Sequence, residues 1–576
     1  MKILSLHCDY IKFKALKPAI KVLVLEKGEE KAVEVKEPLV ILTAVEKQDE
    51  SNKQILEEYI KNILDLKEKI GKVERIVLYP YAHLSSSLSS PDFAKNLLVE
   101  AEQELKKKKI EVFRAPFGFY KEFELKCKGH PLSELSRNIG NAEVVSNKTQ
   151  IGTLVLSKDE AYDPKKLLAE ISKNKLNREK LKDNDHRILG QQMDLFSFSE
   201  VAPGMVFWHD KGWTIYNALV DFWKAEHKKA GYAEISTPMI LDRKLWQISG
   251  HWEKYKENIF LTNYEGREFA VKPMNCPGGM LVYKNRPRSY KELPWRVAEL
   301  GTVHRQELSG VLAGLFRVIK FTQDDAHLYC TEETLENEIA GVIELITGVY
   351  KKFGFSYHIE LSTRPEKRIG DEKMWNLAEK TLENVLKKEK IKYKLNPGDG
   401  AFYGPKIDFH LNDSLGRTWQ CGTIQLDFAM PERFELEYVD KDGKMKRPIM
   451  LHRTVLGSLE RFIGVLLEHL NGRLPTWLAP VQVKVMSFTD KNIKATEKLF
   501  FELKELGIRA EIDIDSAPVQ GKVRNAEMQK IPYLIMIGDK EEAAKTLAVR
   551  SDGKVKFGVK KEEFLKDLLN EIKERK

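Results

Sequence analysis

The pattern of apolar and polar residues changes within residues 447–471, RPIMLHRTVLGSLERFIGVLLEHLN. The segment begins as a short apolar run, which predicts a β-strand. Beyond Gly457 the apolar residues recur every three to four positions, which predicts an amphipathic helix. These helix residues are Leu459, Phe462, Ile463, Leu466, Leu467 and Leu470. The pattern therefore predicts a strand that runs directly into a helix, with Gly457 at the turn and Ser458 as the helix cap.

The first turn of this predicted helix has the features of an anion site. Its free N–H groups attract negative charge, and Arg461 would add a full positive charge, so the junction suits a polyphosphate. An amphipathic helix with an arginine in its first turn is, however, more often an ordinary core helix. The phosphate interpretation therefore needs a second element elsewhere in the chain.

A second informative pattern is a pair of alternating segments, 295–305 and 316–329, which flank a glycine-containing loop. This arrangement predicts an antiparallel hairpin with a long loop. Arg305 and Glu307 lie where the first strand is predicted to end. The hairpin is therefore a candidate partner for the strand-to-helix junction.

The chain divides by pattern into four segments. Residues 1–146 alternate strand and helix patterns, which predicts an α/β domain. Residues 147–184 are densely charged and rich in lysine, which predicts a helical linker. Residues 185–474 contain a long helix pattern followed mainly by strand patterns, and residues 475–576 alternate strand and helix again. The predicted fold class is a multidomain combination of α/β and α+β domains.

Composition and length narrow the class of protein. A single core is not expected for 576 residues, and the 42% hydrophobic and 31% charged content is that of an ordinary globular protein. No apolar run approaches the ~18 residues of a membrane span, and charge interrupts the N-terminal segment within its first residues. The five cysteines are widely spread, which argues against a disulfide framework. We therefore expect a cytoplasmic protein without a membrane partner. The net charge of +9 is compatible with a nucleic-acid partner but hardly favours one.

Arg305-x-Glu307 in the hairpin, followed by Gly457 to Arg461 at the junction, resembles motifs 2 and 3 of the class II aminoacyl-tRNA synthetases. Five longer segments narrow the resemblance to the threonyl-tRNA synthetase family. They are VKPMNCPG at 271–278, FTQDDAH at 321–327, AFYGPKID at 401–408, WQCGTIQLDF at 419–428 and PTWLAPVQV at 475–483. The resemblance implies an antiparallel-sheet catalytic core and a C-terminal α/β anticodon-binding domain.

The resemblance implies an ATP site with two catalytic arginines. Arg305 would bind the α-phosphate, Arg461 the γ-phosphate, and Glu307 the adenine amine. The remaining implied nucleotide contacts are Arg317, Gln420, Thr423 and Ser458. Mg²⁺ would neutralise the phosphates. From the residues alone, Gln420 and Thr423 are better explained by hydrogen bonding within a strand.

The resemblance also implies one zinc ion per subunit, bound by Cys276, His327 and His452. No spacing rule connects these three residues, and each alone is more typical of a buried polar or turn residue. A Cys-His-His set with an open position is the catalytic type of zinc site, to which threonine would bind through its amino and hydroxyl groups. The other implied threonine contacts are Gln323, Asp325, Tyr403 and Gln425. Valine lacks the hydroxyl, whereas serine lacks only a methyl group, worth roughly 1–3 kcal/mol, so we expect serine to be activated as well.

Residues 1–146 resemble the editing domain of archaeal-type threonyl-tRNA synthetases, which is related in fold to D-aminoacyl-tRNA deacylases. The implied working residues are His83, Tyr120, Lys121 and Glu134. The implied reaction is hydrolysis of mischarged seryl-tRNA(Thr), with Lys121 near the developing oxyanion and the other three orienting the ester and a water. From the residues alone, His83 and Lys121 are ordinary surface residues.

Three further assignments rest on the resemblance alone. Glu541 and Arg550 match positions that read anticodon bases, although Ser516 stands where an asparagine is common; without the resemblance they are surface charges. His251 matches a catalytic position near the reacting 3′ ribose of tRNA. Residues 211–238 resemble motif 1, which implies a homodimer.

The resemblance thus implies a threonine–tRNA ligase, which activates L-threonine with ATP, releases pyrophosphate and charges tRNA(Thr). A stand-alone deacylase would need only residues 1–146 and does not account for the hairpin. A non-catalytic tRNA-binding regulatory paralogue would be expected to lose Arg305, Arg461 or a zinc ligand. A seryl or prolyl enzyme would not explain Cys276 together with the two histidines.

Overall fold

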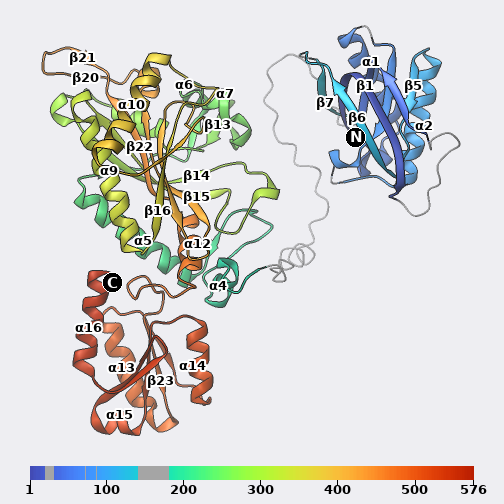
Figure 1. The fold of residues 1–576 in the computed structure, drawn as a ribbon. Coiled ribbons are helices and arrows are strands. Elements are labelled where there is room, and N and C mark those ends of the chain that lie inside the picture. Colours follow the sequence, from blue (N-terminus) through green and yellow to red (C-terminus); the bar gives the residue numbers. More distant parts are fainter. Residues whose placement is uncertain (20–30, 72, 86, 131, 140–180) are drawn as a thin grey trace. The chain divides into compact units, whose positions relative to one another are not determined.

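The computed structural model describes residues 1–19, 31–71, 73–85, 87–130, 132–139 and 181–576 (Figure 1). The chain forms two compact units, residues 1–152 and 153–576, which we describe separately. Most of the predicted linker at 147–184 lies outside the described residues, so its domain boundaries stay predictions. Among the described helices, none has both the length and the apolar character needed to span a membrane. All five cysteines are free.

The first unit is built on a mixed sheet with two helices. Its strands are β1 (Lys2–Pro18), β2 (Val33–Lys36), β3 (Pro38–Ala44), β4 (Arg75–Pro80), β5 (Glu111–Arg114), β6 (Phe119–Cys127) and β7 (Glu134–Asn138). The order is β2-β1-β3-β4-β5, and β6 and β7 also pair with β1. Helices α1 (Ile55–Ile70) and α2 (Pro91–Lys107) share a core with one face of the sheet. Helix α1 ends at Gly71, where φ is 91°, and α2 begins after Ser90 with Pro91 in its first turn.

An eight-stranded sheet forms the centre of the second unit. Its strands, in spatial order, are β10 (Ala233–Glu234), β14 (Trp295–His304), β15 (Lys320–Cys330), β22 (Ile449–Ser458), β19 (Thr418–Asp427), β18 (Lys406–Asn412), β16 (Ser356–Ser362) and β17 (Lys394–Asn396). Only the pairs at the two edges are parallel. Helices α5 (Asp210–Lys229), α9 (Glu332–Lys352), α10 (Glu372–Lys388) and α12 (Leu459–His469) form the main core with this sheet. The predicted antiparallel core is confirmed.

The predicted hairpin is confirmed, although its second strand begins later than expected. The pairing of β14 with β15 runs from Trp295 opposite Tyr329 to His304 opposite Lys320. The prediction that this strand starts at residue 316 is wrong, because the ring of Phe316 packs against other parts of the fold instead of joining the ladder. The loop between the strands is therefore longer than the sequence pattern indicated.

The predicted strand-to-helix junction is also confirmed. Strand β22 ends at Ser458, and α12 begins at the next residue. Shorter elements surround the central sheet: α4 (His186–Gln192), β8 (Phe196–Ser197), β9 (Phe207–Trp208), β11 (Ile240–Asp242), α6 (Arg243–Ile248), α7 (His251–Tyr255), β12 (Leu261–Tyr264), β13 (Arg267–Val271), α8 (Cys276–Lys284), α11 (Ala429–Arg433), β20 (Tyr438–Val439) and β21 (Met445–Lys446).

The C-terminal region contains a second, five-stranded sheet. Its strands, in spatial order, are β24 (Ala510–Asp513), β23 (Val483–Ser487), β25 (Tyr533–Ile537), β26 (Thr546–Ser551) and β27 (Lys554–Lys560). Its helices are α13 (Ile493–Glu505), α14 (Val519–Met528), α15 (Asp539–Ala544) and α16 (Lys561–Glu574). The predicted α/β alternation is confirmed through β25.

Candidate active site

A cavity of 690 Å³ lies on the face of the central sheet that does not carry the main helical core. It is lined by every residue predicted for the synthetic site except His251 and His327. These lining residues are Cys276, Arg305, Glu307, Arg317, Gln323, Asp325, Tyr403, Gln420, Thr423, Gln425, His452, Ser458 and Arg461. A hollow of 770 Å³ beside α9 and β16 contains none of the predicted residues. The cavity on the sheet is therefore the candidate active site.

The register of three strands explains why residues distant in sequence meet here. Gln323, Asp325 and His327 occupy alternate positions of β15, so their side chains project from one face. Strand pairing places His327 opposite His452 on β22, and His452 opposite Gln425 on β19. Side chains directly opposite each other on neighbouring strands are close enough to act together. The register therefore assembles one row of polar groups beneath the cavity.

The junction between β22 and α12 is shaped by a residue that the sequence analysis left without a role. Buried Asp324 accepts the N–H groups of Val455, Leu456 and Gly457 at 2.9, 2.8 and 2.8 Å. Gly457 has φ of 81°, and a Cβ there would approach a carbonyl oxygen of β19 to 2.9 Å. The Oγ of Ser458 accepts the N–H of residue 461 at 3.0 Å, which confirms the predicted cap. Asp324 thus holds the turn that presents the first turn of α12.

Three arginines bring positive charge to the cavity. The Nε of Arg461 donates to the carbonyl of Phe316 at 2.9 Å, and Arg317 donates to the carboxylate of Glu307 at 2.8 and 3.0 Å. Burial lowers the pKa of Arg461, and the charges of Arg305 and Arg317 lower it further. Like charges around one cavity favour a bound anion, and paired guanidinium groups match phosphate oxygens. The arrangement suits a polyphosphate ligand.

Gln420 and Thr423 share one acceptor in the same cavity. The Nε2 of Gln420 donates to Asp408 Oδ1 at 2.5 Å, and the Oγ1 of Thr423 donates to the same oxygen at 3.1 Å. Asp408 is buried and also accepts from Ser362 at 2.7 Å. Both side chains therefore hydrogen-bond to a carboxylate instead of to a neighbouring strand's backbone. Their contact with a nucleotide stays a prediction.

The residues predicted around the amino acid form a small polar pocket. The hydroxyl of Tyr403 donates to Gln425 Oε1 at 2.6 Å, and Asn275 Nδ2 lies 3.4 Å from Asp325 Oδ2. Burial raises the pKa of Asp325 to about 7. A bound ammonium group would favour the ionised carboxylate by direct attraction. The pocket can therefore accept a ligand that carries an amino group.

Cys276, His327 and His452 meet with their donor atoms within 4.8 Å of one another, and all three are buried. The Nε2 of His327 is buried and has no hydrogen-bond partner. The Nε2 of His452 donates to Asp427 Oδ2 at 2.8 Å, which leaves its Nδ1 to face a ligand. A thiol and two imidazoles, one of them oriented by a carboxylate, are a donor set that suits zinc. The residues present therefore fit the implied metal.

His251 lies beside the cavity but does not line it. Its side chain is fully buried, its Nδ1 is 2.8 Å from Ser249 Oγ, and its ring packs edge-on against Trp246 and Phe402. Burial lowers the pKa of His251 to about 3, so the imidazole is neutral. Its predicted part in transfer to tRNA stays a prediction.

Two predicted editing residues in the first unit, Lys121 and His83, are connected by contacts with two tyrosine rings that lie between them. The Nζ of Lys121 donates to Pro116 O at 3.0 Å and lies 5.1 Å from the ring centre of Tyr79. Tyr79 contacts Tyr81, whose ring meets that of His83 edge-on at 5.4 Å. Lys121 and His83 therefore flank one pair of tyrosines.

The other two predicted editing residues are placed differently. Tyr120 is 57% exposed and adjoins Lys121 on β6, so the two side chains project from opposite faces. Glu134 begins β7 and lies beside Cys127, whose pKa is raised by burial and by this carboxylate. Cys127 and Lys121 occupy positions on β6 that are about 20 Å apart. The structure does not bring Glu134 to Lys121 within this chain.

The predicted anticodon residues each have a structural partner. Glu541 Oε2 accepts the N–H of Gly538 at the start of α15 at 3.2 Å. Arg550 on β26 forms an ion pair with Glu527 at 2.7 Å, and Ser516 is exposed before α14. Contact of Glu541 and Arg550 with anticodon bases stays a prediction.

Three family models match successive parts of the chain. A tRNA synthetase class II core domain (G, H, P, S and T) matches residues 259–470. An Archaea-specific editing domain of threonyl-tRNA synthetase matches residues 1–139, and an anticodon binding domain matches residues 480–571. A crystal structure described as the RNA binding domain of threonyl-tRNA synthetase from Cryptosporidium parvum Iowa II is 40% identical, with a TM-score of 0.65. The match covers 67% of this chain and 98% of that one. The chain belongs to the threonyl-tRNA synthetase family.

Curated relatives in this threonyl-tRNA synthetase family are longer than the chain. A threonine–tRNA ligase of Caldanaerobacter subterraneus subsp. tengcongensis is 54% identical over 395 residues, which cover 68% of this chain and 61% of the relative. One from Clostridium botulinum (strain Loch Maree / Type A3) is 55% identical over 396 residues, which cover 69% of this chain and 62% of the relative. The chain therefore spans a little over three fifths of each curated sequence.

Three buried carboxylates near the site had no role in the sequence analysis: Asp324, Asp408 and Asp427. Asp324 holds the junction, Asp408 orients Gln420, and Asp427 orients His452. Each lies inside or beside a segment that resembles the family. A charged residue at a position predicted to be buried in a strand is the signal that would have found them, because buried carboxylates need hydrogen-bond partners.

Proposed function

We propose that this chain is a threonine–tRNA ligase that carries its own editing domain. The proposal is supported above all by one observation: the cavity is lined by three arginines and by Cys276 and His452, two members of the group that also contains His327. A polyphosphate site beside a pocket that can hold an amino acid is what amino-acid activation requires, because the two reactants must be held next to each other. The synthetase family models and the editing model within one chain support the same conclusion.

The first reaction is an in-line displacement at the α-phosphorus of ATP. A carboxylate oxygen of threonine forms a new bond to phosphorus, the bond to the β-phosphate oxygen breaks, and pyrophosphate leaves. Arg305 binds the α-phosphate and Arg461 the γ-phosphate, while Glu307 accepts from the adenine amine. Arg317, Gln420, Thr423 and Ser458 complete the nucleotide contacts. No protein nucleophile takes part, so the residues act by orientation and by charge.

Metal ions serve two separate purposes in this proposal. Mg²⁺ bound to the ATP phosphates would neutralise their charge. Zinc held by Cys276, His327 and His452 would supply a Lewis acid that recognises the amino and hydroxyl groups of threonine. Gln323, Asp325, Tyr403 and Gln425 surround the amino acid. Tyr403 and Gln425 are already hydrogen-bonded to each other at 2.6 Å, so this side of the pocket is in place before a ligand arrives.

The need for editing follows from the amino-acid pocket. Serine keeps the hydroxyl that distinguishes threonine from valine and lacks only a methyl group, worth roughly 1–3 kcal/mol. Seryl-tRNA(Thr) therefore forms and has to be hydrolysed. His83 and Lys121, with the adjacent Tyr120, would carry this hydrolysis in the first unit, whereas the predicted Glu134 lies beside Cys127 and away from Lys121. The proposed partners are tRNA(Thr) and a second copy of the chain. Glu541 and Arg550 would contact the anticodon, and His251 would act at the tRNA 3′ end. The proposed location of the protein is the cytoplasm.

The test is ATP–pyrophosphate exchange with threonine, serine and valine, on the native protein and on Cys276→Ser. We expect strong exchange with threonine, weaker exchange with serine and almost none with valine. Cys276→Ser should lose the exchange because a serine hydroxyl is a poor zinc ligand. If no amino acid supports exchange while the protein still binds tRNA, a deacylase or a regulatory tRNA-binding protein replaces the ligase.

A further inference from the structure

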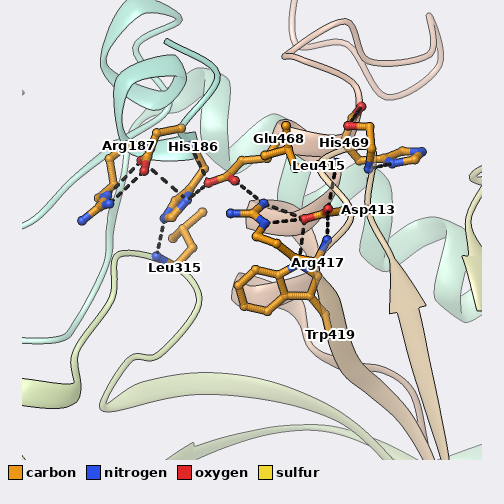
Figure 2. A network of polar contacts seen from close by, with 11 residues as sticks. His186, Arg187, Leu315, Asp413, Leu415, Arg417, Trp419, Glu468 and His469 are labelled. Carbon is orange, nitrogen blue, oxygen red and sulfur yellow. Dashed lines mark hydrogen bonds and ion pairs between the residues drawn. The ribbon is translucent and has the colours of Figure 1, made fainter. Parts of the chain in front are cut away.

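A chain of polar contacts, with His186 and Glu468 buried within it, connects α4 to the end of α12 (Figure 2). It connects four segments that are distant in sequence: α4, the long loop of the hairpin, the end of α12 and the turn between β18 and β19. None of its members was assigned a role in the sequence analysis. The network contains two histidines, three carboxylates and two arginines, so its hydrogen bonds define the positions of the four segments closely.

His186 is the link between α4 and the hairpin loop. Its Nε2 accepts the N–H of Leu315 at 2.9 Å, so its Nδ1 carries the hydrogen and donates to Glu468 Oε1 at 2.6 Å. The backbone N–H of His186 donates to the same oxygen at 3.0 Å. Gly314, next to Leu315, has φ of 53°, and a Cβ there would stand 2.2 Å from the imidazole. The loop backbone therefore lies directly against the ring.

The second part of the network holds Glu468 in place. Arg417 donates to Glu468 Oε2 at 2.5 Å and to Asp413 Oδ2 at 2.6 Å. Asp413 also accepts the indole N–H of Trp419 at 2.9 Å. Burial raises the pKa of Glu468, but the hydrogen bonds from His186 and Arg417 outweigh it and hold the pKa below its ordinary value. Glu468 is therefore an ionised acceptor that fixes the orientation of the imidazole.

The network reaches the cavity through Phe316. Its ring lies between the rings of His186 and Trp419, with centroid distances of 4.2 Å to each. Its carbonyl oxygen accepts the Nε of Arg461 at 2.9 Å. The residue that orients the Arg461 guanidinium is thus the direct neighbour of Leu315, whose N–H is bound by His186.

One part of the network, the group Asp185, His186 and Glu468, resembles a metal site, but its arrangement is explained without a metal ion. Asp185, His186 and Glu468 bring their donor atoms together. However, both ring nitrogens of His186 are hydrogen-bonded, and both carboxylates accept from arginines at 2.5 to 2.9 Å. The group is satisfied by hydrogen bonds within the protein.

We propose that His186 is a positioning residue for ATP. By accepting the N–H of Leu315, it fixes the loop so that the Phe316 carbonyl holds Arg461 toward the phosphates. This inference rests on the proposed ligase function. According to this inference, α4, which lies outside the recognised motifs, affects the affinity for ATP but not the affinity for the amino acid.

Two amide substitutions test the proposal, because each replaces only one of the two ring nitrogens of His186. In His186→Gln the side-chain oxygen replaces Nε2 and can still accept from Leu315. In His186→Asn the amide replaces Nδ1 and keeps only the contact with Glu468. We expect His186→Asn to raise the KM for ATP about tenfold in the exchange assay, because a buried N–H loses its acceptor. We expect His186→Gln to stay near the native value, and the KM for threonine to be unchanged in both.

His469→Ala is the matched control, because His469 accepts the N–H of Ser414 at the far end of the network. It should leave the KM for ATP unchanged. Equal KM values for ATP in the Asn and Gln variants, or a parallel rise for ATP and threonine, would overturn the positioning role. Arg461→Ala separates a failure of the proposed ATP site from a failure of the role of His186. If Arg461→Ala shows normal exchange, the proposed ATP site is wrong. If Arg461→Ala is inactive but His186→Asn has the native KM for ATP, only the role of His186 is wrong.

Discussion

Asp427 gives the sharpest test of the proposed zinc site, because its hydrogen bond to a predicted zinc ligand is the one from His452. Its Oδ2 accepts from His452 Nε2 at 2.8 Å, and its Oδ1 accepts the N–H groups of Ala429 and Met430 at 2.8 and 2.9 Å. In Asp427→Asn the amide oxygen should stay with the two backbone donors. The amide N–H₂ would then face His452, whose hydrogen would have to move to the nitrogen that is left for the metal.

The expected magnitude follows from this change of tautomer. Loss of a carboxylate that orients a metal-bound histidine lowers metal affinity about 10- to 100-fold, or ~1.4–2.7 kcal/mol. The substitution hardly changes volume, so the fold should persist. The assay is competition for Zn²⁺ between the protein and a chromophoric chelator. Threonine-dependent exchange should fall at limiting zinc and recover when zinc is added.

Asp408→Asn is the control for this experiment. Asp408 is an equally buried carboxylate on the same sheet, but it accepts hydrogen bonds from Ser362, Gln420 and Thr423 and pairs with Lys406 at 2.8 Å. It should leave zinc affinity unchanged. Native zinc affinity in Asp427→Asn, or an equal loss in both variants, would refute the argument that Asp427 fixes the tautomer of a metal ligand.

Three further predictions address other parts of the chain. Arg461→Ala should reduce exchange about 10²–10³-fold at fixed ATP, as removal of one charged donor from a reacting centre does. Lys121→Ala should slow hydrolysis of seryl-tRNA(Thr) at least about tenfold without changing threonine-dependent exchange; equal hydrolysis would exclude a role for this lysine. Gly301→Ala would place a Cβ 2.0 Å from Asn275 Oδ1 and should lower the free energy of unfolding by about 1–3 kcal/mol in urea. Gly341→Ala in α9, where nothing lies within 4 Å of the new Cβ, should not be destabilised; an equal loss would contradict the steric argument.

Local features of the fold could be predicted from the sequence because they depend on neighbouring residues. The switch in periodicity at Gly457 located the end of β22 and the start of α12, and Ser458 caps the helix as predicted. The start of β15 could not be predicted in the same way. Residues 316–318 alternate like a strand, but Phe316 is held by rings from distant segments.

The site was less predictable from residue patterns than the elements that carry it. Cys276, His327 and His452 meet because of the register between β15 and β22 and the placement of α8, which no spacing rule encodes. Only the resemblance to the family connected them. The partners of His186 were missed for the same physical reason, since every bond in that network joins segments that are remote in sequence.

Strand β15 carries Gln323 and Asp325 on its cavity face and Asp324 between them, with its backbone ladder shared between β14 and β22. A slip of one residue in this register would exchange the two faces and remove nucleotide and amino-acid contacts together. Amino-acid preference and ATP binding therefore cannot drift independently through backbone shifts. A variant selected for a different amino acid would have to change side chains on a fixed strand, which makes this strand a suitable target for saturation mutagenesis.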